Sequence, residues 1–203
     1  MQPTGEIIAH PARGTLTGNR GVLGFDAQGR LGTARWRHPH WISCTLTHPK
    51  GRYHGPQPEG RWTPLFFLDE AVALAAGHRP CGYCRPAAYA AFKSAWAAAH
   101  GHALHREMDQ ALHRSRVTRN RVQITHQAEA DLLPDGCFIE HEGKPHLLMG
   151  EGCRPYLFDR YGAAVDWPKG LVTTLTPKPI LAVLAAGFAP LLHSSAEPPL
   201  ARP

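Results

Sequence analysis

The most regular hydrophobic pattern in the chain is helical and covers residues 86–101. Large apolar side chains recur there three or four positions apart, which is the spacing of one helix face. These side chains are Tyr89, Phe92 and Trp96. Pro86 suits the first position of a helix and Gly101 suits its end, so we predict one helix between them.

Two further segments carry helical patterns. Residues 70–76 form an alanine-rich apolar run that follows Asp69, a favourable N-cap, and precedes Gly77, a favourable C-terminal residue. Residues 103–116 carry apolar side chains four positions apart. These are Leu104, Met108 and Leu112. We predict a short helix at the first segment and a longer helix at the second.

The N-terminal part also contains short stretches that are typical of β-strands. Residues 13–36 are rich in glycine, and we expect tight turns at 18–19 and 28–29, where the residues tolerate a positive φ. Strands are predicted at 41–46 and at 63–68.

The pattern changes in the C-terminal part. Residues 134–158 alternate between short apolar stretches and turn sequences, which is typical of a β-meander. Another strand is predicted at 170–175. Thr176 is expected to cap a last helix that runs over residues 177–187.

These changes of pattern divide the chain into four segments of an α+β protein. They are an N-terminal module at 1–101, a basic helical connector at 102–123, a small β-meander plus helix at 124–195, and a disordered tail at 196–203. Because no flexible linker separates the two folded parts, we expect that they share a core.

The composition excludes several classes of protein. The chain has 203 residues, enough to bury a core, and its 43% hydrophobic content argues against general disorder. No apolar run approaches the roughly eighteen residues of a membrane span, and no secretory signal pattern is visible. Five cysteines without such a signal indicate the reducing cytoplasm, where paired cysteines serve metal or redox chemistry.

Candidate metal ligands occur as two pairs. Cys81 and Cys84 are separated by two residues, and such a turn brings both sulfurs to one side of the chain at zinc-binding reach. Upstream, Cys44 is followed four residues later by His48. The two pairs would complete a closed tetrahedral site of three cysteines and one histidine, so Zn²⁺ is the predicted cofactor.

The sequence around the second pair resembles a known family. Residues 71–86 read AVALAAGHRPCGYCRP, which is similar to the second half of the metal-binding domain of Ada, the bacterial methylated-DNA response and repair protein. The matching positions are Gly77, Arg79, Pro80, Cys81, Cys84, Arg85 and Pro86, and His78 takes the family's aromatic position. The resemblance covers roughly residues 44–86.

This resemblance implies an Ada-like zinc module, with β-hairpins and short helices, and a role in DNA repair or its regulation. The family's upstream ligands are a Cys-x3-Cys pair, whereas this chain offers Cys44 and His48 at the same spacing. His54 is an alternative fourth ligand, and His78 is a less favoured one. In the family, the first cysteine of the upstream pair accepts a methyl group from a DNA phosphotriester, so the resemblance makes Cys44 a candidate catalytic nucleophile.

Nucleic acid, and DNA in particular, is the predicted partner. The chain has 22 basic and 16 acidic residues, a net charge of +6, which is compatible with a polyanionic ligand. Six arginines are the candidate phosphate contacts: Arg79, Arg85, Arg114, Arg116, Arg119 and Arg121. A solvated helix face is the simpler explanation for the run at 106–121.

Three other functions stay open at this point. One is an alkyl-accepting repair enzyme that uses Cys44, and another is a protein-interaction module in which zinc only stabilises the fold. The third is dithiol chemistry, because Cys-Gly-Tyr-Cys also occurs in thioredoxin-type isomerases. That chemistry needs a helix that begins at the first cysteine, whereas here Pro86 restarts a helix only after Cys84.

Overall fold

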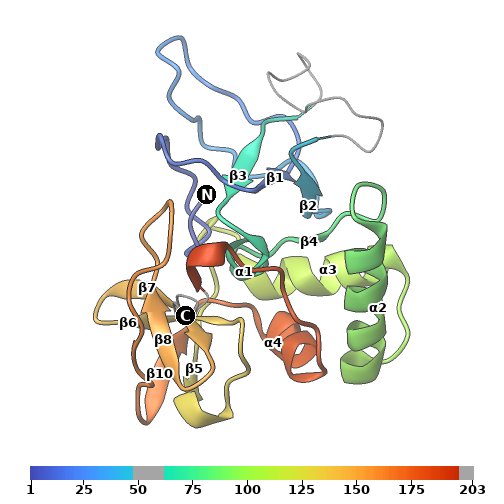
Figure 1. Cartoon of the computed structure of the whole chain (residues 1–203). Helices are drawn as coiled ribbons and strands as arrows, with labels where there is room; N and C mark the ends of the chain where they lie inside the picture. Colours follow the sequence, from blue (N-terminus) through green and yellow to red (C-terminus); the bar gives the residue numbers. More distant parts are fainter. Residues whose placement is uncertain (48–61, 197–203) are drawn as a thin grey trace.

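Two β-sheets and four α-helices make up the fold of the described residues (Figure 1). The structure is a computed structural model that describes residues 1–47 and 62–196. The α+β class predicted from the sequence is therefore confirmed.

The first sheet has four short strands in the order β3-β1-β2-β4. They are β1 (Leu16–Asn19), β2 (Ile42–Thr45), β3 (Leu65–Phe67) and β4 (Arg79–Pro80). β1 is antiparallel to both of its neighbours, whereas β2 and β4 run parallel. The strands that the sequence predicts at 41–46 and 63–68 are both present but shorter, with four and three residues.

The second sheet has six antiparallel strands in the order β5-β10-β6-β7-β8-β9. They are β5 (His126–Glu129), β6 (Phe138–His141), β7 (Lys144–Met149), β8 (Gly152–Pro155), β9 (Val165–Asp166) and β10 (Leu171–Thr174). The predicted meander over residues 134–158 is confirmed as the run β6-β7-β8, and β10 pairs between β5 and β6.

The helices are α1 (Glu70–Ala75), α2 (Pro86–His100), α3 (His105–Arg116) and α4 (Lys178–Ala185). Figure 1 shows α2 on the side of the molecule away from the second sheet, with α4 between them. The predicted ends of α1 are confirmed, because Asp69 Oδ1 accepts the Val72 N–H at 3.0 Å and Gly77 has a φ of +80°. No helix in the described ranges is long and apolar enough to cross a membrane.

Short 3-10 turns occupy Ala130–Leu132 and Ser194–Ala196. The second turn reaches the start of the predicted disordered tail, and Ala196 itself is fully buried. The remaining tail positions, 197–203, lie outside the described residues.

The turn predicted at 18–19 is wrong, because Gly18 and Asn19 both lie within β1. Glycine is needed there for a close approach, not for a positive φ. A Cβ at Gly18 would lie 2.4 Å from a ring carbon of Phe67 on the neighbouring strand. The second predicted turn is confirmed, since Gly29 has a φ of +73° and donates its N–H to the Asp26 carbonyl at 2.9 Å.

The predicted capping role of Thr176 is also wrong. Pro177 is the N-cap of α4, and no side chain caps that helix. The Thr176 hydroxyl oxygen instead accepts the backbone N–H of Phe138 at 2.9 Å, in the interior. The hydroxyl therefore satisfies a buried donor at the start of β6 and joins the helix to the sheet.

Helix α1 connects two hydrophobic cores. All six of its residues are buried. Leu74 belongs to the core formed with α2, α3, α4 and the second sheet, whereas Val72 belongs to the core beneath the first sheet. Phe138 and Leu147 of the second sheet also enter the latter core. Both cores thus combine residues from before the predicted boundary at 101 with residues from after the boundary at 124.

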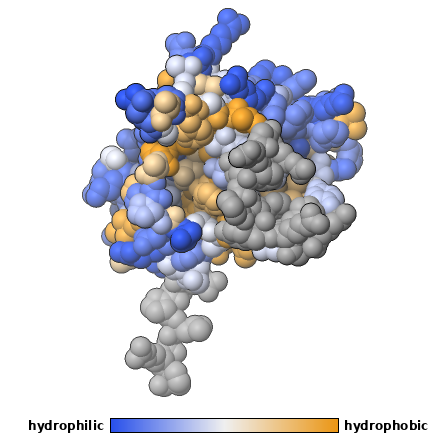
Figure 2. Space-filling view, turned by 90° about the horizontal axis from the view of Figure 1, so that it is seen from above, coloured by the Kyte–Doolittle hydropathy of each residue, from blue (hydrophilic) through white to orange (hydrophobic). Residues whose placement is uncertain are grey.

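The end of the molecule that carries the first sheet exposes apolar surface. Figure 2 shows hydrophobic patches between hydrophilic margins on this face. Exposed apolar side chains in this part of the chain include Val22, Phe25 and Phe66, and Phe25 is the most accessible at 52%. Single exposed apolar residues are normal in soluble domains, so this surface alone assigns no function.

We expect Gly18→Ala to lower the free energy of unfolding by about 1–3 kcal/mol, because the new methyl group would overlap the Phe67 ring. Denaturant unfolding monitored by circular dichroism measures the effect. Gly24→Ala is the matched control, since a Cβ at Gly24 would meet no atom within 4 Å. Equal losses in the two variants would contradict the packing explanation.

Candidate metal centre

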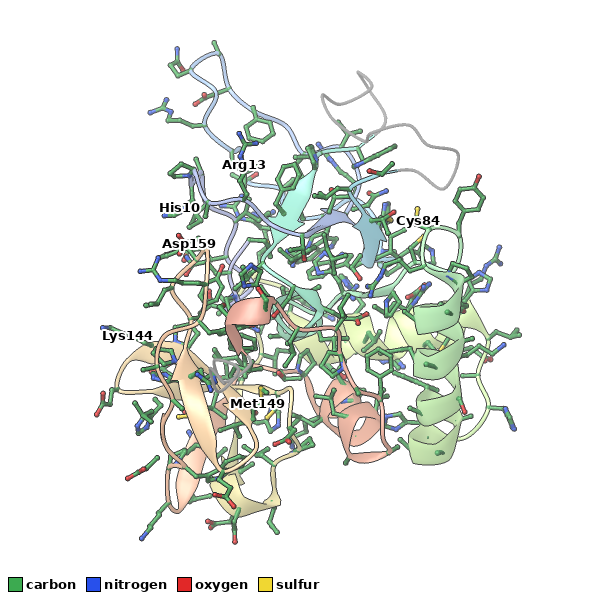
Figure 3. All side chains as sticks on the ribbon, viewed as in Figure 1. His10, Arg13, Cys84, Lys144, Met149 and Asp159 are labelled. Atoms are coloured by element: carbon green, nitrogen blue, oxygen red, sulfur yellow. The ribbon has the colours of Figure 1, made fainter. Side chains whose placement is uncertain are left out.

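Three cysteines converge beside the first sheet. The sulfur atoms of Cys44, Cys81 and Cys84 all lie within 4.8 Å of one another. The residues come from two segments that are far apart in the sequence, β2 and the turn between β4 and α2. Figure 3 shows Cys84 on that turn, beside the end of β2.

The parallel pairing of β2 and β4 positions this cluster. Ile42 lies opposite Arg79 and Ser43 opposite Pro80. The Cys81 N–H then donates to the Ser43 carbonyl at 3.0 Å. Cys44 and Cys81 are the next residues on the two strands, so the strand register places their side chains close together.

A tight turn brings the third sulfur back to the first two. The Arg85 N–H donates to the Cys81 carbonyl at 2.9 Å, which closes the turn, and α2 begins directly afterwards at Pro86. Cys81 is buried, whereas Cys44 and Cys84 are partly exposed. The cluster is therefore accessible from one side.

Hydrogen bonds concentrate negative charge on one sulfur. The pKa of Cys81 is lowered to about 5, chiefly because the Cys44 thiol donates to it, with further donation from the Cys84 and Tyr83 N–H groups. The pKa of Cys44 is raised by that same hydrogen bond and by burial. Burial and the charge of Cys81 raise the pKa of Cys84. Three sulfurs that compete for protons in this way form a donor set suited to a thiophilic cation.

The predicted ligands divide into three groups. Cys44, Cys81 and Cys84 are brought together as expected. His48 and the alternative His54 lie outside the described residues.

His78, the less favoured candidate, lies elsewhere. Its ring is fully buried, its Nε2 accepts from the Arg20 side chain at 3.2 Å, and it packs edge-on against Phe67. Burial, followed by the charges of Arg20 and Arg116, lowers its pKa well below the usual value.

The other two cysteines serve the hydrophobic core. Cys137 and Cys153 are fully buried among apolar side chains. Burial raises the pKa of Cys137 to about 12, which is the behaviour of an inert interior thiol. Across residues 1–47 and 62–196, the three converging cysteines are the only such group of potential metal ligands.

A buried ion pair holds the strand that leads into the cysteine turn. The Arg79 guanidinium donates to both carboxylate oxygens of Asp109 on α3, at 2.7 and 2.8 Å. The Arg79 and Asp109 side chains are 7% and 0% exposed. The partly exposed His40 ring lies 2.7 Å from the same carboxylate. This bidentate geometry fixes β4 against α3.

A second ion pair holds the segment that leaves the turn. Arg85 Nη1 lies 2.8 Å from the Glu70 carboxylate of α1, and it also donates to the Ser43 hydroxyl at 3.1 Å. Both charged side chains are nearly buried, at 8% and 3% exposed. The arginines on either side of the cysteine turn therefore anchor it to α1, β2 and α3.

The six arginines predicted to contact phosphate do not share one surface. Arg79 and Arg116 are buried, and Arg85 is engaged with Glu70, so these three guanidinium groups have interior partners in this structure. Three remain exposed, at the end of α3 and in the turn that follows: Arg114, Arg119 and Arg121.

Sequence reasoning missed the acidic partners in this arrangement. Asp109 and Glu70 carry no motif, and each meets an arginine that is distant in the sequence. One signal was available for Asp109, which lies three residues before the apolar Leu112 on the helical pattern. A carboxylate on the apolar face of a helix needs a buried partner.

The geometry also bears on dithiol chemistry. Helix α2 begins at Pro86, beyond Cys84, so Cys81 does not lie at its N-terminus. The low pKa of Cys81 arises mainly from Cys44, a third sulfur.

Comparisons of the chain with protein-family models, curated proteins and solved structures give no match. The chemistry of the site therefore follows from the geometry of its own residues. Any proposed function must account for three features of the site. These are the three converging sulfurs, the ion pairs that hold the cysteine turn, and the partial exposure of Cys44.

We expect Cys44→Ser, Cys81→Ser and Cys84→Ser each to lower the amount of metal bound per chain, because each removes one of three converging sulfurs. Metal content per chain is measured by elemental analysis after gel filtration. Cys153→Ser is the control, since Cys153 is an interior cysteine outside the cluster. Unchanged metal content in all three cluster variants would contradict the assignment of these sulfurs as ligands.

We expect Asp109→Asn to destabilise the fold by about 3–5 kcal/mol, because it leaves the buried Arg79 guanidinium without its counter-charge. The variant should also release a metal ion bound at the cysteine cluster to a chelator more readily, since Arg79 precedes the cysteine turn. Denaturant unfolding and chelator competition measure the two effects.

Asp159→Asn is the matched control for this experiment. Asp159 pairs with Arg160 on the surface, where both side chains are more than half exposed, so its loss should cost less than about 1 kcal/mol. Similar losses for the two variants would contradict a structural role of the buried pair.

Proposed function

We propose that this protein holds one zinc ion and binds nucleic acid, in association with DNA repair or its regulation. The metal ligands are Cys44, Cys81, Cys84 and, as the fourth, His48. The observation that carries the proposal is the convergence of three cysteine sulfurs from two distant segments. The resemblance of residues 44–86 to the Ada metal-binding domain supports the same choice of ligands.

The donor set favours zinc. Thiolates are the preferred ligands of Zn²⁺ in structural sites, and a Zn–S length of about 2.3 Å in a tetrahedron separates two sulfurs by about 3.8 Å. The observed limit of 4.8 Å lies close to this separation, so small side-chain rotations suffice to bind the ion. A bound zinc would also replace the protons that the three thiols share.

The fourth ligand is assigned from chain connectivity. Strand β2 ends at Thr45, and His48 follows three residues later in the same segment as Cys44. His54 is the alternative in that segment. Imidazole reaches zinc at nearly the same distance as a thiolate, so the change from the family's second cysteine preserves the site.

Positive charge supports nucleic acid as the partner. The chain carries a net charge of +6, and Arg114, Arg119 and Arg121 are exposed near the end of α3. None of these three forms an ion pair with a carboxylate in the described parts of the chain. Unpaired surface arginines are the residues that phosphate backbones contact most readily.

A second candidate function is alkyl acceptance by Cys44. Cys44 is partly exposed, whereas Cys81 is buried, and Cys44 matches the reactive position of the Ada domain. A zinc-bound Cys44 thiolate would attack the methyl carbon of a phosphotriester, forming a sulfur–carbon bond and releasing a phosphodiester anion. Mass spectrometry after exposure to methylated DNA would show a methyl group on Cys44 if this function holds.

We expect the zinc-loaded protein to bind DNA with an affinity that falls steeply with salt, because released counterions drive phosphate contacts. Arg114→Gln and Arg119→Gln should each reduce the slope of log K against log salt by about one. Fluorescence anisotropy with labelled DNA over a series of salt concentrations measures the slope.

Arg160→Gln is the control for this experiment, since Arg160 lies beyond β8 and is paired with Asp159. No measurable binding at low salt would exclude the nucleic-acid function. It would leave a zinc-stabilised interaction module as the remaining interpretation.

A further inference from the structure

A cavity of about 370 Å³ lies beside Trp41, where the end of β1, the segment before β2 and the turn after α3 meet. Four arginines line it, and Glu6 is the only acidic residue among the lining residues described. The arginines are Arg20, Arg35, Arg116 and Arg121. We call this space the arginine cavity.

Two of these arginines are interior residues that stack on one indole. The guanidinium carbons of Arg20 and Arg116 lie 3.5 and 3.7 Å from the centre of the Trp41 ring. Their exposed fractions are 2% and 1%, and that of Trp41 is 1%. The wall of the cavity is thus built from buried, fixed cations.

Hydrogen bonds to neutral groups hold the two buried guanidinium groups in place. Arg20 donates to the His78 ring at 3.2 Å and to the Ala76 carbonyl at 2.9 Å. Arg116 donates to the Gly77 carbonyl at 2.6 Å and to the Pro39 carbonyl at 2.5 Å. Its Nε is buried and has no hydrogen-bond partner in the described part of the chain.

In the described parts of the chain, these charges form no ion pair with a carboxylate. Within residues 1–47 and 62–196, no carboxylate lies within 4.0 Å of any of the four cavity arginines. The nearby Asp109 is already held by Arg79 and His40. Burial, followed by the charge of Arg116, lowers the pKa of Arg20, and burial lowers that of Arg116. Buried cations without a counter-ion are costly, and a bound anion would remove that cost.

The remaining lining residues indicate which anion fits. Arg35 and Arg121 are more accessible than the two buried arginines and add two more cations. The paired N–H groups of a guanidinium match the spacing of two phosphate oxygens. Several arginines together favour a group with more than one negative charge. Trp36 is partly exposed at the same wall and offers a face on which a base can stack. The volume is sufficient for a small ligand.

We infer that the arginine cavity binds a nucleotide phosphate, with Arg20 and Arg116 as fixed cations and Arg35 and Arg121 as its accessible contacts. This inference deepens the proposed function and rests on it for the choice of a nucleotide. A concave site with buried cations in its wall suits a terminal phosphate better than the middle of a strand. The source is either a free nucleotide or the phosphorylated end of a nucleic acid.

The test uses the zinc-loaded full chain and three probes: inorganic phosphate, adenosine monophosphate, and a short oligonucleotide with and without terminal phosphates. Arg121→Gln should weaken phosphate-dependent binding about tenfold, the effect of losing one charge-assisted contact. Arg160→Gln is the control, because Arg160 is a surface residue paired with Asp159 and does not line the cavity. Calorimetry and anisotropy give the affinities, and thermal melting verifies that both variants are folded.

Arg35→Gln provides an independent variant on a different segment of the cavity lining and should behave like Arg121→Gln. If the protein prefers phosphorylated ends, and both variants lose that preference while Arg160→Gln keeps it, the source is a nucleic-acid end. Binding of adenosine monophosphate with the same pattern supports a free nucleotide.

Two results distinguish a failure of the cavity site from a failure of the proposed function. One outcome is DNA binding of equal affinity with and without terminal phosphates, reduced to the same extent by Arg119→Gln and Arg121→Gln. This outcome would overturn the cavity site and support the proposed function. Binding of phosphate or adenosine monophosphate without any DNA binding would support the cavity and contradict nucleic acid as the partner.

Discussion

The parallel pairing of β2 with β4 is the constraint on which the site depends. It is a short contact, two residues on each strand, yet it sets Cys44 beside Cys81. Two residues of parallel ladder supply little stability alone, so the register is held from outside the sheet. The buried ion pairs of Arg79 and Arg85 supply that support, because they join the strand before the turn and the segment after it to three neighbouring elements.

The interior of this protein contains an unusual amount of charge, arranged in two ways. Arg79 and Arg85 are matched with carboxylates, and their role is to position the cysteine turn. Among the described residues, Arg20 and Arg116 contact carbonyls, two histidines and an indole but no carboxylate, although they are buried at least as deeply. A cation with a carboxylate partner is a structural element, whereas a buried cation without one points to a ligand.

Local patterns in the sequence were sufficient for the helices and for the cysteine turn, because caps, glycine and periodicity act within a few residues. The convergence of Cys44 on Cys81 and Cys84 was also predicted, from ligand spacing and from the resemblance to the Ada domain. Burial was not predictable for the arginines, since Arg79 meets Asp109 across 30 residues and Arg116 meets Gly77 across 39. The turn predicted at Gly18 was wrong for the same reason, because the close neighbour of this glycine, Phe67, lies on another strand. Contacts between distant segments decide these positions, and no local pattern encodes them.

The most direct test of the account is X-ray absorption at the zinc edge of the wild-type protein, purified with zinc present throughout. We predict one zinc per chain, with three sulfur neighbours at about 2.3 Å and one nitrogen at about 2.0 Å. A shell made only of oxygen and nitrogen neighbours, or a chain that retains no zinc, would contradict the central claim that Cys44, Cys81 and Cys84 hold the metal.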